Sequence, residues 1–315
     1  MRILSKTAGK DFTVLNLTDI HWDIVAWAPG NQEYETVVGT IRELVQRTKP
    51  DLITISGDLS WGMAVESYVA VADLMDSFGI PWAPVWGNHD HEKEAVNQGA
   101  VEEFAKRPLC LFEAGEPELG CGNYTLVIRE EGRTVAALLM ADTHKNAMTI
   151  DENGNEISTW GRLYPNQLDW IRQQCKELRT DTALIQHIPI YGYDEAAQAA
   201  YRSDVDRKSI TVEESYSSAC WNPGYEDSIG VQHEGICSFP EDEGALEVCL
   251  EAGIKAIIVG HDHNNNYIIR HKGIRFVFSL KTGPACYWQP ELSGGTVIKI
   301  TSQGIGDIYH EYVTI

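Results

Sequence analysis

The stretch Trp82-Ala-Pro-Val-Trp-Gly-Asn-His-Asp90 places an amide, an imidazole and a carboxylate on three successive residues, directly after an apolar run. Val85 and Trp86 are typical of the end of a buried strand, and Gly87 lets the backbone turn there without a steric penalty. The polar residues 88–90 then follow the carboxyl end of that strand, where open α/β sheets bind their ligands. The stretch therefore predicts an α/β sheet with a functional site at this edge.

Two strand–helix units precede this stretch. Apolar runs over 12–17 and 51–56 predict two strands. After each strand, apolar residues recur with helical spacing, over 34–45 and 65–75, and Pro50 ends the first of these helices. The resulting β-α-β-α-β series predicts a parallel sheet with right-handed crossovers.

The rest of the chain continues as strands with fewer helices. Further helices are predicted at 92–107, from Pro165 to Leu178 and around 246–250. Further strands are predicted at 124–128, 135–140, 182–185, 254–259, 267–269, 275–280, 296–300 and 307–314, the first two forming a hairpin, and 151–155 is the turn of a surface excursion. Residues 191–240 are rich in Gly, Ser and Tyr, and an irregular stretch of this length is typical of a lid or binding loop. We expect a single domain over 1–315, with a substrate-pocket insertion at about 191–240.

Composition excludes several classes of protein. The net charge of −21 argues against a nucleic-acid scaffold or an anionic membrane as partner, because both require clustered Lys and Arg. The 7 cysteines include no C-x-x-C pair, which argues against a disulfide framework and against a cysteine-based zinc site. The N-terminus lacks the apolar segment of a signal peptide, and no apolar run is long enough to span a membrane, so we expect a cytoplasmic protein.

Four more polar clusters follow apolar strands: Asp19-x-His21, Gly57-Asp58, His187 and Gly260-His-Asp-His263. Alone, most of these patterns are common as helix caps, turns or surface histidines. The last cluster is stronger, because two imidazoles two residues apart in an extended segment point the same way. All the clusters supply oxygen or imidazole ligands without cysteine, a set that suits Zn, Mn or Fe in two adjacent sites.

Together with Gly87-Asn-His-Asp90, this ordered series resembles the calcineurin-like metallophosphoesterase superfamily, and the resemblance spans nearly the whole chain. It implies a two-sheet β-sandwich flanked by helices, the αββα fold, and two divalent or trivalent metal ions (Mn, Fe or Zn). Residue by residue, it assigns Asp19, His21, Asp58 and His263 to one metal, and Asp58, Asn88, His187 and His261 to the other, with Asp58 bridging.

The resemblance also implies a reaction. A hydroxide that bridges the metals attacks the phosphorus of a small phosphate ester, with Asp58 and His89 as catalytic residues, and His89 is the candidate for protonating the leaving alkoxide. Two cations outweigh the charges of Asp19, Asp58 and the hydroxide, so a positive centre remains in an acidic protein. Hydrolysis of phosphomonoesters is favoured. A phosphodiesterase acting on cyclic nucleotides or glycerophosphodiesters is the alternative, and a non-catalytic protein-binding scaffold is a remote one.

One position departs from the pattern of many family members. They carry Gly-Asp-x-x-Asp, whose second Asp orients the catalytic histidine, whereas this chain has Trp61 there. Another group must therefore orient His89, and Asp90 and Asp23 are the candidates. The purple acid phosphatases carry a tyrosine ligand at this same position, so the chain is related to them but distinct, and we expect no tyrosinate–iron colour.

The other polar residues have weaker expectations. His144 could line the cleft or be a satisfied loop histidine, and His91 is interpreted as a solvated neighbour of the motif. Five residues of the irregular region either line the substrate pocket or serve only in packing, and the sequence leaves both alternatives open: His233, Tyr191, Tyr193, Trp221 and Tyr225. His271 and His310 carry no functional signal, and no Arg is placed as a phosphate clamp.

Overall fold

The β-α-β-α-β series forms one half of the structure, a computed structural model that describes residues 1–313. Its elements are β2 (Phe12–Leu17), α1 (Gln32–Thr48), β3 (Leu52–Ser56), α2 (Val65–Asp76) and β4 (Trp82–Val85). The three strands are parallel and adjacent, as the sequence predicts. The Asn31 side chain caps α1 by accepting from two backbone N–H groups, and the left-handed Lys49 ends the helix before Pro50.

Two antiparallel strands complete this sheet. They are β13 (Gly294–Thr301) and β14 (Gly304–Tyr312), and the strand order is β14-β13-β2-β3-β4. The predicted strand 307–314 corresponds to the second half of β14, and its last residue, Thr314, lies outside the described residues.

The second sheet has the order β1-β5-β6-β9-β10-β12-β11. Its strands are β1 (Arg2–Ser5), β5 (Tyr124–Glu130), β6 (Arg133–Met140), β9 (Asp181–Ile185), β10 (Ile254–Val259), β11 (Ile268–His271) and β12 (Ile274–Phe278). The hairpin of β5 and β6 is confirmed. The edge strand β1 was not predicted, because its four largely exposed residues contain only two apolar ones, Ile3 and Leu4, too few to form a recognisable apolar run.

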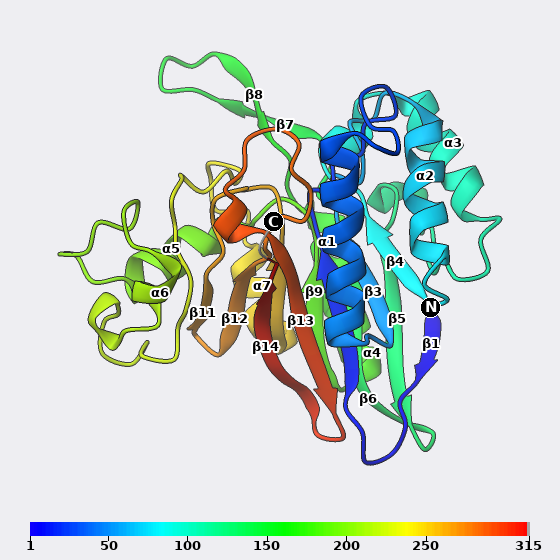
Figure 1. The fold of residues 1–315 in the computed structure, drawn as a ribbon. Coiled ribbons are helices and arrows are strands. Elements are labelled where there is room, and N and C mark those ends of the chain that lie inside the picture. Colours follow the sequence, from blue (N-terminus) through cyan, green and yellow to red (C-terminus); the bar gives the residue numbers. More distant parts are fainter. Residues whose placement is uncertain (314–315) are drawn as a thin grey trace.

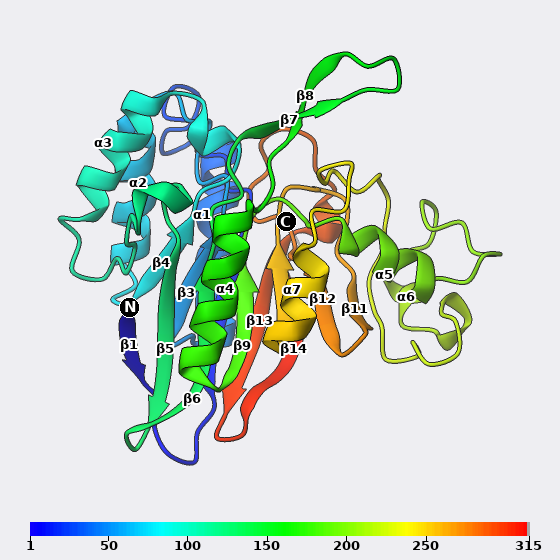
Figure 2. The same cartoon turned by 180° about the vertical axis from the view of Figure 1, so that it is seen from behind.

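The two sheets pack face to face, and helices cover their outer faces (Figures 1 and 2). Along β6, Ala136, Leu138 and Met140 face the core between the sheets, and Leu139 faces a second core on the outer side. Helices α1, α2 and α3 (Glu94–Phe104) cover the five-stranded sheet (Figure 1), and α4 (Pro165–Leu178) and α7 (Ala245–Ala252) cover the other (Figure 2). The predicted two-sheet fold flanked by helices is confirmed.

Two excursions leave this sandwich. The first is a hairpin of β7 (Asn146–Ile150) and β8 (Glu156–Trp160), which projects beyond the strand ends (Figure 1). The second is the region 191–240, where α5 (Gly192–Ala200) packs beside β11 and α6 (Val212–Ser215) follows. Within residues 1–313, no helix combines the length and apolarity needed to cross a bilayer.

Candidate metal centre

All seven predicted ligands lie at one edge of the sandwich, and both sheets contribute to them. Asp19 and His21 follow β2, Asp58 follows β3, Asn88 follows β4, His187 follows β9, and His261 and His263 follow β10. Neighbouring parallel strands end at the same edge, which explains why residues so distant in sequence meet. Their assignment as metal ligands stays a prediction that the geometry below supports.

One group of donor atoms surrounds the imidazole of His21. Its Nε2 lies 3.3 Å from Nε2 of His263 and 3.6 Å from Oδ2 of Asp58. Nε2 of His263 lies 3.3 Å from Oδ1 of Asp19. The donor atoms of Asp19, His21 and His263 all lie within 4.8 Å of one another, which is compact enough for a single cation.

A second group surrounds the imidazole of His187. Its Nε2 lies 3.3 Å from Oδ2 of Asp58 and 3.1 Å from Oδ1 of Asn88. The ring of His261 is 5.1 Å from the ring of His187, centroid to centroid. The same Asp58 oxygen therefore lies beside both groups, as a bridging carboxylate requires.

Four of the predicted ligands have a left-handed backbone, which is unusual for residues other than glycine. The φ angles are 52° at Asp19, 50° at His21, 50° at Asp58 and 77° at His261. Such conformations cost free energy and cluster at functional sites. Backbone hydrogen bonds hold the first turns in place, since the N–H groups of Asp19 and His21 donate to the carbonyls of Gly57 and Asp58.

Glycines next to the ligands allow the side chains to approach the backbone. A Cβ atom on Gly87 would overlap the carboxylate of Asp58, and one on Gly57 would overlap the imidazole of His187. The Gly residues in the Gly-Asp and Gly-Asn-His-Asp motifs thus make room for the donor atoms of the neighbouring strand.

Burial dominates the electrostatics of the site. Burial and the nearby Lys281 ammonium lower the pKa of His21 to about 3, and burial also lowers that of His261 to about 3. At His187, burial is outweighed by the carboxylate of Asp58, which raises the imidazole pKa to about 9. In turn, His187 overcomes burial and holds the pKa of the Asp58 carboxyl below its usual range.

A sequence model of the calcineurin-like phosphoesterase family matches residues 12–265, which is most of the chain. The chain belongs to this family. "Probable inactive purple acid phosphatase 28" of Arabidopsis thaliana is 27% identical over 267 residues, covering 79% of this chain and 62% of that protein. A "probable cyclic nucleotide phosphodiesterase" of Synechococcus sp. is 28% identical over 179 residues, covering 56% of this chain and 58% of that protein.

Solved structures show the same fold at low sequence identity. A dimetal phosphatase from Danio rerio superposes with a TM-score of 0.53 at 11% identity, covering 95% of this chain and 98% of that one. The family is metal-dependent and built around a two-metal centre. The donor atoms of this calcineurin-like phosphoesterase should therefore suit two cations.

The donor set of this calcineurin-like phosphoesterase fits two cations. Oδ1 of Asp19 and Nε2 of His261 are buried polar atoms without a hydrogen-bond partner among the described residues. Such orphans are rare unless an ion or water satisfies them. Nδ1 of His187 lies 2.8 Å from the carbonyl of Ser56, and Nδ1 of His263 lies 2.9 Å from that of Tyr287. Both Nε2 atoms are therefore directed at the other predicted ligands, as metal binding through Nε2 would require.

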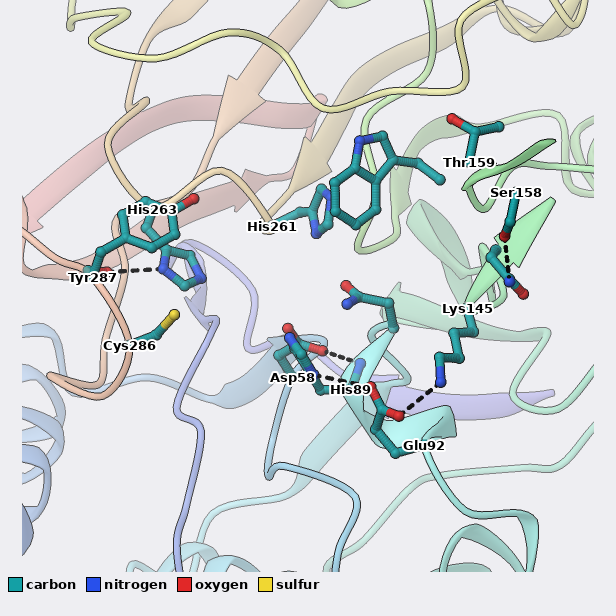
Figure 3. A pocket seen from close by; sticks show the side chains of 13 residues that line it. Asp58, His89, Glu92, Lys145, Ser158, Thr159, His261, His263, Cys286 and Tyr287 are labelled. Carbon is teal, nitrogen blue, oxygen red and sulfur yellow. Dashed lines mark hydrogen bonds and ion pairs between the residues drawn. The ribbon is translucent and has the colours of Figure 1, made fainter. Parts of the chain in front are cut away.

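A cavity of about 600 Å³ opens over this centre (Figure 3). Besides predicted ligands, its lining includes His89, Glu92, Lys145, Asn146, Ser158, Thr159, Trp160, Cys286 and Tyr287. The hairpin of β7 and β8 therefore supplies one wall, and the ring of Trp160 lies 4.6 Å from that of His261, centroid to centroid. From sequence, the residues of this hairpin are expected only to form a surface excursion.

None of the residues that line this cavity comes from 191–240. Cys237 of that region lies beside the predicted ligand His261, however, so a substrate-pocket role for 191–240 stays a prediction. Tyr193 and Trp221 belong to the outer core of the seven-stranded sheet, and Tyr191 is exposed. His233 binds Gln289 and the Ile210 carbonyl, and Tyr225 binds His271. Packing, the other reading left open for these residues, is what the structure favours.

Two neighbouring histidines also have structural partners. His91 is not a solvated neighbour, because its Nε2 lies 2.9 Å from Oδ1 of the buried Asp142, which outweighs burial and raises the pKa of His91. His144 pairs with Gln167, at 3.2 Å, and its ring packs against Tyr164. It is the satisfied loop histidine rather than a residue lining the cleft.

Neither candidate for orienting His89 does so. The Asp90 carboxylate accepts from the backbone N–H of Gly87 and from the Tyr68 hydroxyl, each at 2.8 Å. The Asp23 carboxylate accepts from the backbone of its own loop, at Val25 and Ala26. The carboxylate that does lie beside His89 is that of Glu92, a residue that the sequence interpretation missed although its i,i+3 spacing in a helical turn could have indicated it.

Proposed function

We propose that this protein is a metal-dependent phosphoesterase that hydrolyses small phosphomonoesters. The observation that carries the proposal is the convergence of seven donor side chains from both sheets, with Oδ2 of Asp58 within 3.3 Å of His187 and 3.6 Å of His21. Bound metal ions would supply Lewis acidity, which acidifies water and neutralises charge on the phosphoryl group.

The protein's own residues have defined tasks in this reaction. Asp19, His21, Asp58 and His263 would hold one ion, and Asp58, Asn88, His187 and His261 the other. Hydrolysis joins a water oxygen to phosphorus and breaks the bond from phosphorus to the leaving oxygen. His89 lines the cavity and would give its proton to that oxygen, so that the alcohol leaves neutral.

A phosphodiesterase is the second candidate. The cavity of about 600 Å³ is within the range of sites for drug-sized ligands, so it has room for a group on each side of the phosphate. The relative named as a probable cyclic nucleotide phosphodiesterase supports the same class of reaction. Monoesters remain our choice, with the diester as the competing outcome of the test.

A non-catalytic scaffold is the remote alternative, since the fold alone does not determine function. The name of the Arabidopsis relative includes the word inactive. In this chain, however, every predicted ligand type stands at its strand end, and His89 lines the cavity beside them. That complete set favours an enzyme.

The test compares p-nitrophenyl phosphate with bis-p-nitrophenyl phosphate after addition of Mn, Zn or Fe to protein purified without chelator. We expect metal to bind and the monoester to be turned over faster. Faster turnover of the diester would favour the second candidate. Protein that stays metal-free and inactive after every addition would favour the scaffold.

A further inference from the structure

The position of Trp61 raises the question of what orients His89. The indole packs against two imidazoles, with ring centroids 4.3 Å from His21 and 4.9 Å from His89. Its edge-to-face contact with His89 restricts how that ring can turn, but an indole has no acceptor for an imidazole N–H. A separate acceptor is therefore needed to select the ring orientation and tautomer.

Glu92 is placed to be this acceptor. Its Oε1 lies 3.3 Å from Nδ1 of His89, one helical turn back along the chain in the segment that begins with the 3₁₀ turn η1 (His89–His91). With Nδ1–H directed at Glu92, the proton available to the leaving oxygen is the one on Nε2 of the doubly protonated ring, which keeps its Nδ1–H when that proton is given up. Figure 3 shows both side chains on the wall of the cavity.

Lys145 fixes the other oxygen of the same carboxylate. Its Nζ lies 2.7 Å from Oε2 of Glu92, and it comes from the residue immediately before β7. All three side chains remain partly exposed, at 32% for His89, 30% for Glu92 and 41% for Lys145. An ion pair as exposed as Glu92–Lys145 adds little to the free energy of unfolding. Its role must therefore lie in where it holds the Glu92 carboxylate.

We propose that Glu92 and Lys145 are positioning residues for His89: Lys145 holds the Glu92 carboxylate, and the carboxylate holds the imidazole with Nε2 towards the leaving oxygen. In this chain, the pair replaces the second Asp of the Gly-Asp-x-x-Asp pattern from a different place in the fold. The catalytic part of this inference rests on the proposed phosphoesterase function. The structural part does not.

The kinetic test uses the dependence on the leaving group. A p-nitrophenolate leaves readily without a proton, whereas phenolate is a poorer leaving group and gains more from an acid. Glu92→Met should lower kcat for phenyl phosphate about tenfold, a part of the 10²–10⁴-fold that acid catalysis supplies. For p-nitrophenyl phosphate, the loss should be no more than about twofold, with KM unchanged.

Companion variants separate positioning from other roles. Glu92→Gln keeps an acceptor oxygen and should restore part of the lost rate, and Lys145→Met should show the same leaving-group pattern at a smaller size. In a His89→Ala background, Glu92→Met should have no further effect. Equal losses for the two esters, an effect that persists without His89, or a raised KM as the main effect of Lys145→Met would overturn the proposal.

An exposed ion pair elsewhere provides the matched control. Glu103 and Lys106, 2.5 Å apart at the end of α3, also combine one carboxylate with one ammonium. Glu103→Met and Lys106→Met remove the same charges from the surface, and both should leave the two rates unchanged. Losses equal to those of the Glu92 and Lys145 variants would show a general charge effect and contradict the positioning role.

A second readout does not need activity. In the full-length, zinc-loaded protein with ¹⁵N-labelled histidine, the His89 signals are identified by their loss in His89→Ala. We expect a proton on Nδ1 that is retained in Glu92→Gln and lost in Glu92→Met. An unchanged Nδ1–H in Glu92→Met would refute the contact. If the wild type hydrolyses neither ester, the proposed function and the catalytic part fail, and this spectrum still decides the positioning.

Discussion

Two parts of the molecule face each other across the cavity, and they are built in opposite ways. The floor consists of the strand-end residues Asp19–His21, Asp58, Asn88, His187 and His261–His263, all of them buried. The roof is the hairpin 146–160, which exposes Met148, Ile150 and Ile157 and is held by few contacts to the sandwich. The floor can hold donor atoms in strained conformations because both sheets support it, whereas the roof is free to vary.

The contrast suggests a division of labour. Under the proposed function, the floor would set the chemistry, since a carboxylate that bridges two metal ions would have to hold its position to within fractions of an ångström. The roof would shape the space for the rest of the substrate. At its base, Lys145 pairs with Glu92, and Glu92 in turn lies beside His89. Changes in the floor should therefore affect metal and turnover, and changes in the roof should affect substrate preference.

The largest effect is expected from Asp58→Asn. The amide cannot bridge two cations as a carboxylate does, so both metals should bind more weakly and turnover should fall at least about 10³-fold. Metal analysis of the purified protein and kcat measured with added Mn check this. His89→Ala is the matched variant, which should lower turnover about 10²–10⁴-fold while the metal content is retained. Equal loss of metal in the two variants would contradict their assigned roles.

Burial should also make stability depend on pH through His310 in β14. Burial lowers the pKa of His310 from 6.5 to about 4, while its Nε2 faces the carbonyl of Asn266. Between these pH values, the unfolded chain binds a proton that the folded state excludes, so the free energy of unfolding falls as pH drops. The contribution of His310 to the free energy of unfolding over this pH range is at most about 3 kcal/mol.

Urea unfolding at several pH values measures that slope. His310→Gln should flatten it between pH 6.5 and 4, since glutamine does not titrate there. If the free energy of unfolding depends on pH equally in the wild type and in His310→Gln, His310 is not the group responsible. A variant that is less stable at every pH by the same amount would keep the wild-type slope, so a general loss of stability cannot imitate the predicted result.

The close packing of the floor predicts that Gly87→Ala damages the site. The added methyl group would overlap the carboxylate and backbone of Asp58, and a shift of about 1 Å there should lower kcat about 10²-fold. Gly39→Ala is the control, because Gly39 lies within α1 with open space around it. That change should leave activity intact and raise the free energy of unfolding by up to about 1 kcal/mol. Full activity in Gly87→Ala would mean that the floor is more adaptable than we infer.

The smallest effect is expected from the roof. Trp160→Ala removes a wall of the cavity and should raise KM for aryl phosphates by about threefold to tenfold, with metal content unchanged. Met148→Ala changes an exposed residue of the same hairpin that does not line the cavity, and it should have no effect on KM. A loss of metal in Trp160→Ala would remove the distinction between the two parts.

Sequence predicted the floor far better than the roof, for a physical reason. The apolar runs before Asp19, Asp58 and Asn88 identify buried strands, and a ligand that follows a strand by two or three residues is a local pattern. Glu92 and Lys145 are exposed charges 53 residues apart, and such residues are common on any surface. The hairpin and the region 191–240 both look irregular in sequence, so only their packing could tell which one reaches the cavity.

Sequence by itself therefore determined most of the strands and helices and the identity of the side chains that converge at the strand ends, because period, glycine placement and strand-end position are local properties. The two-sheet class of fold followed from the resemblance of the whole motif series to a known family. The tertiary structure alone decided which hairpin lines the cavity and that Glu92 lies beside His89, where Asp90 or Asp23 was expected. Those facts depend on how separate segments pack, and contacts between distant segments produce no repeating pattern of residues in the sequence.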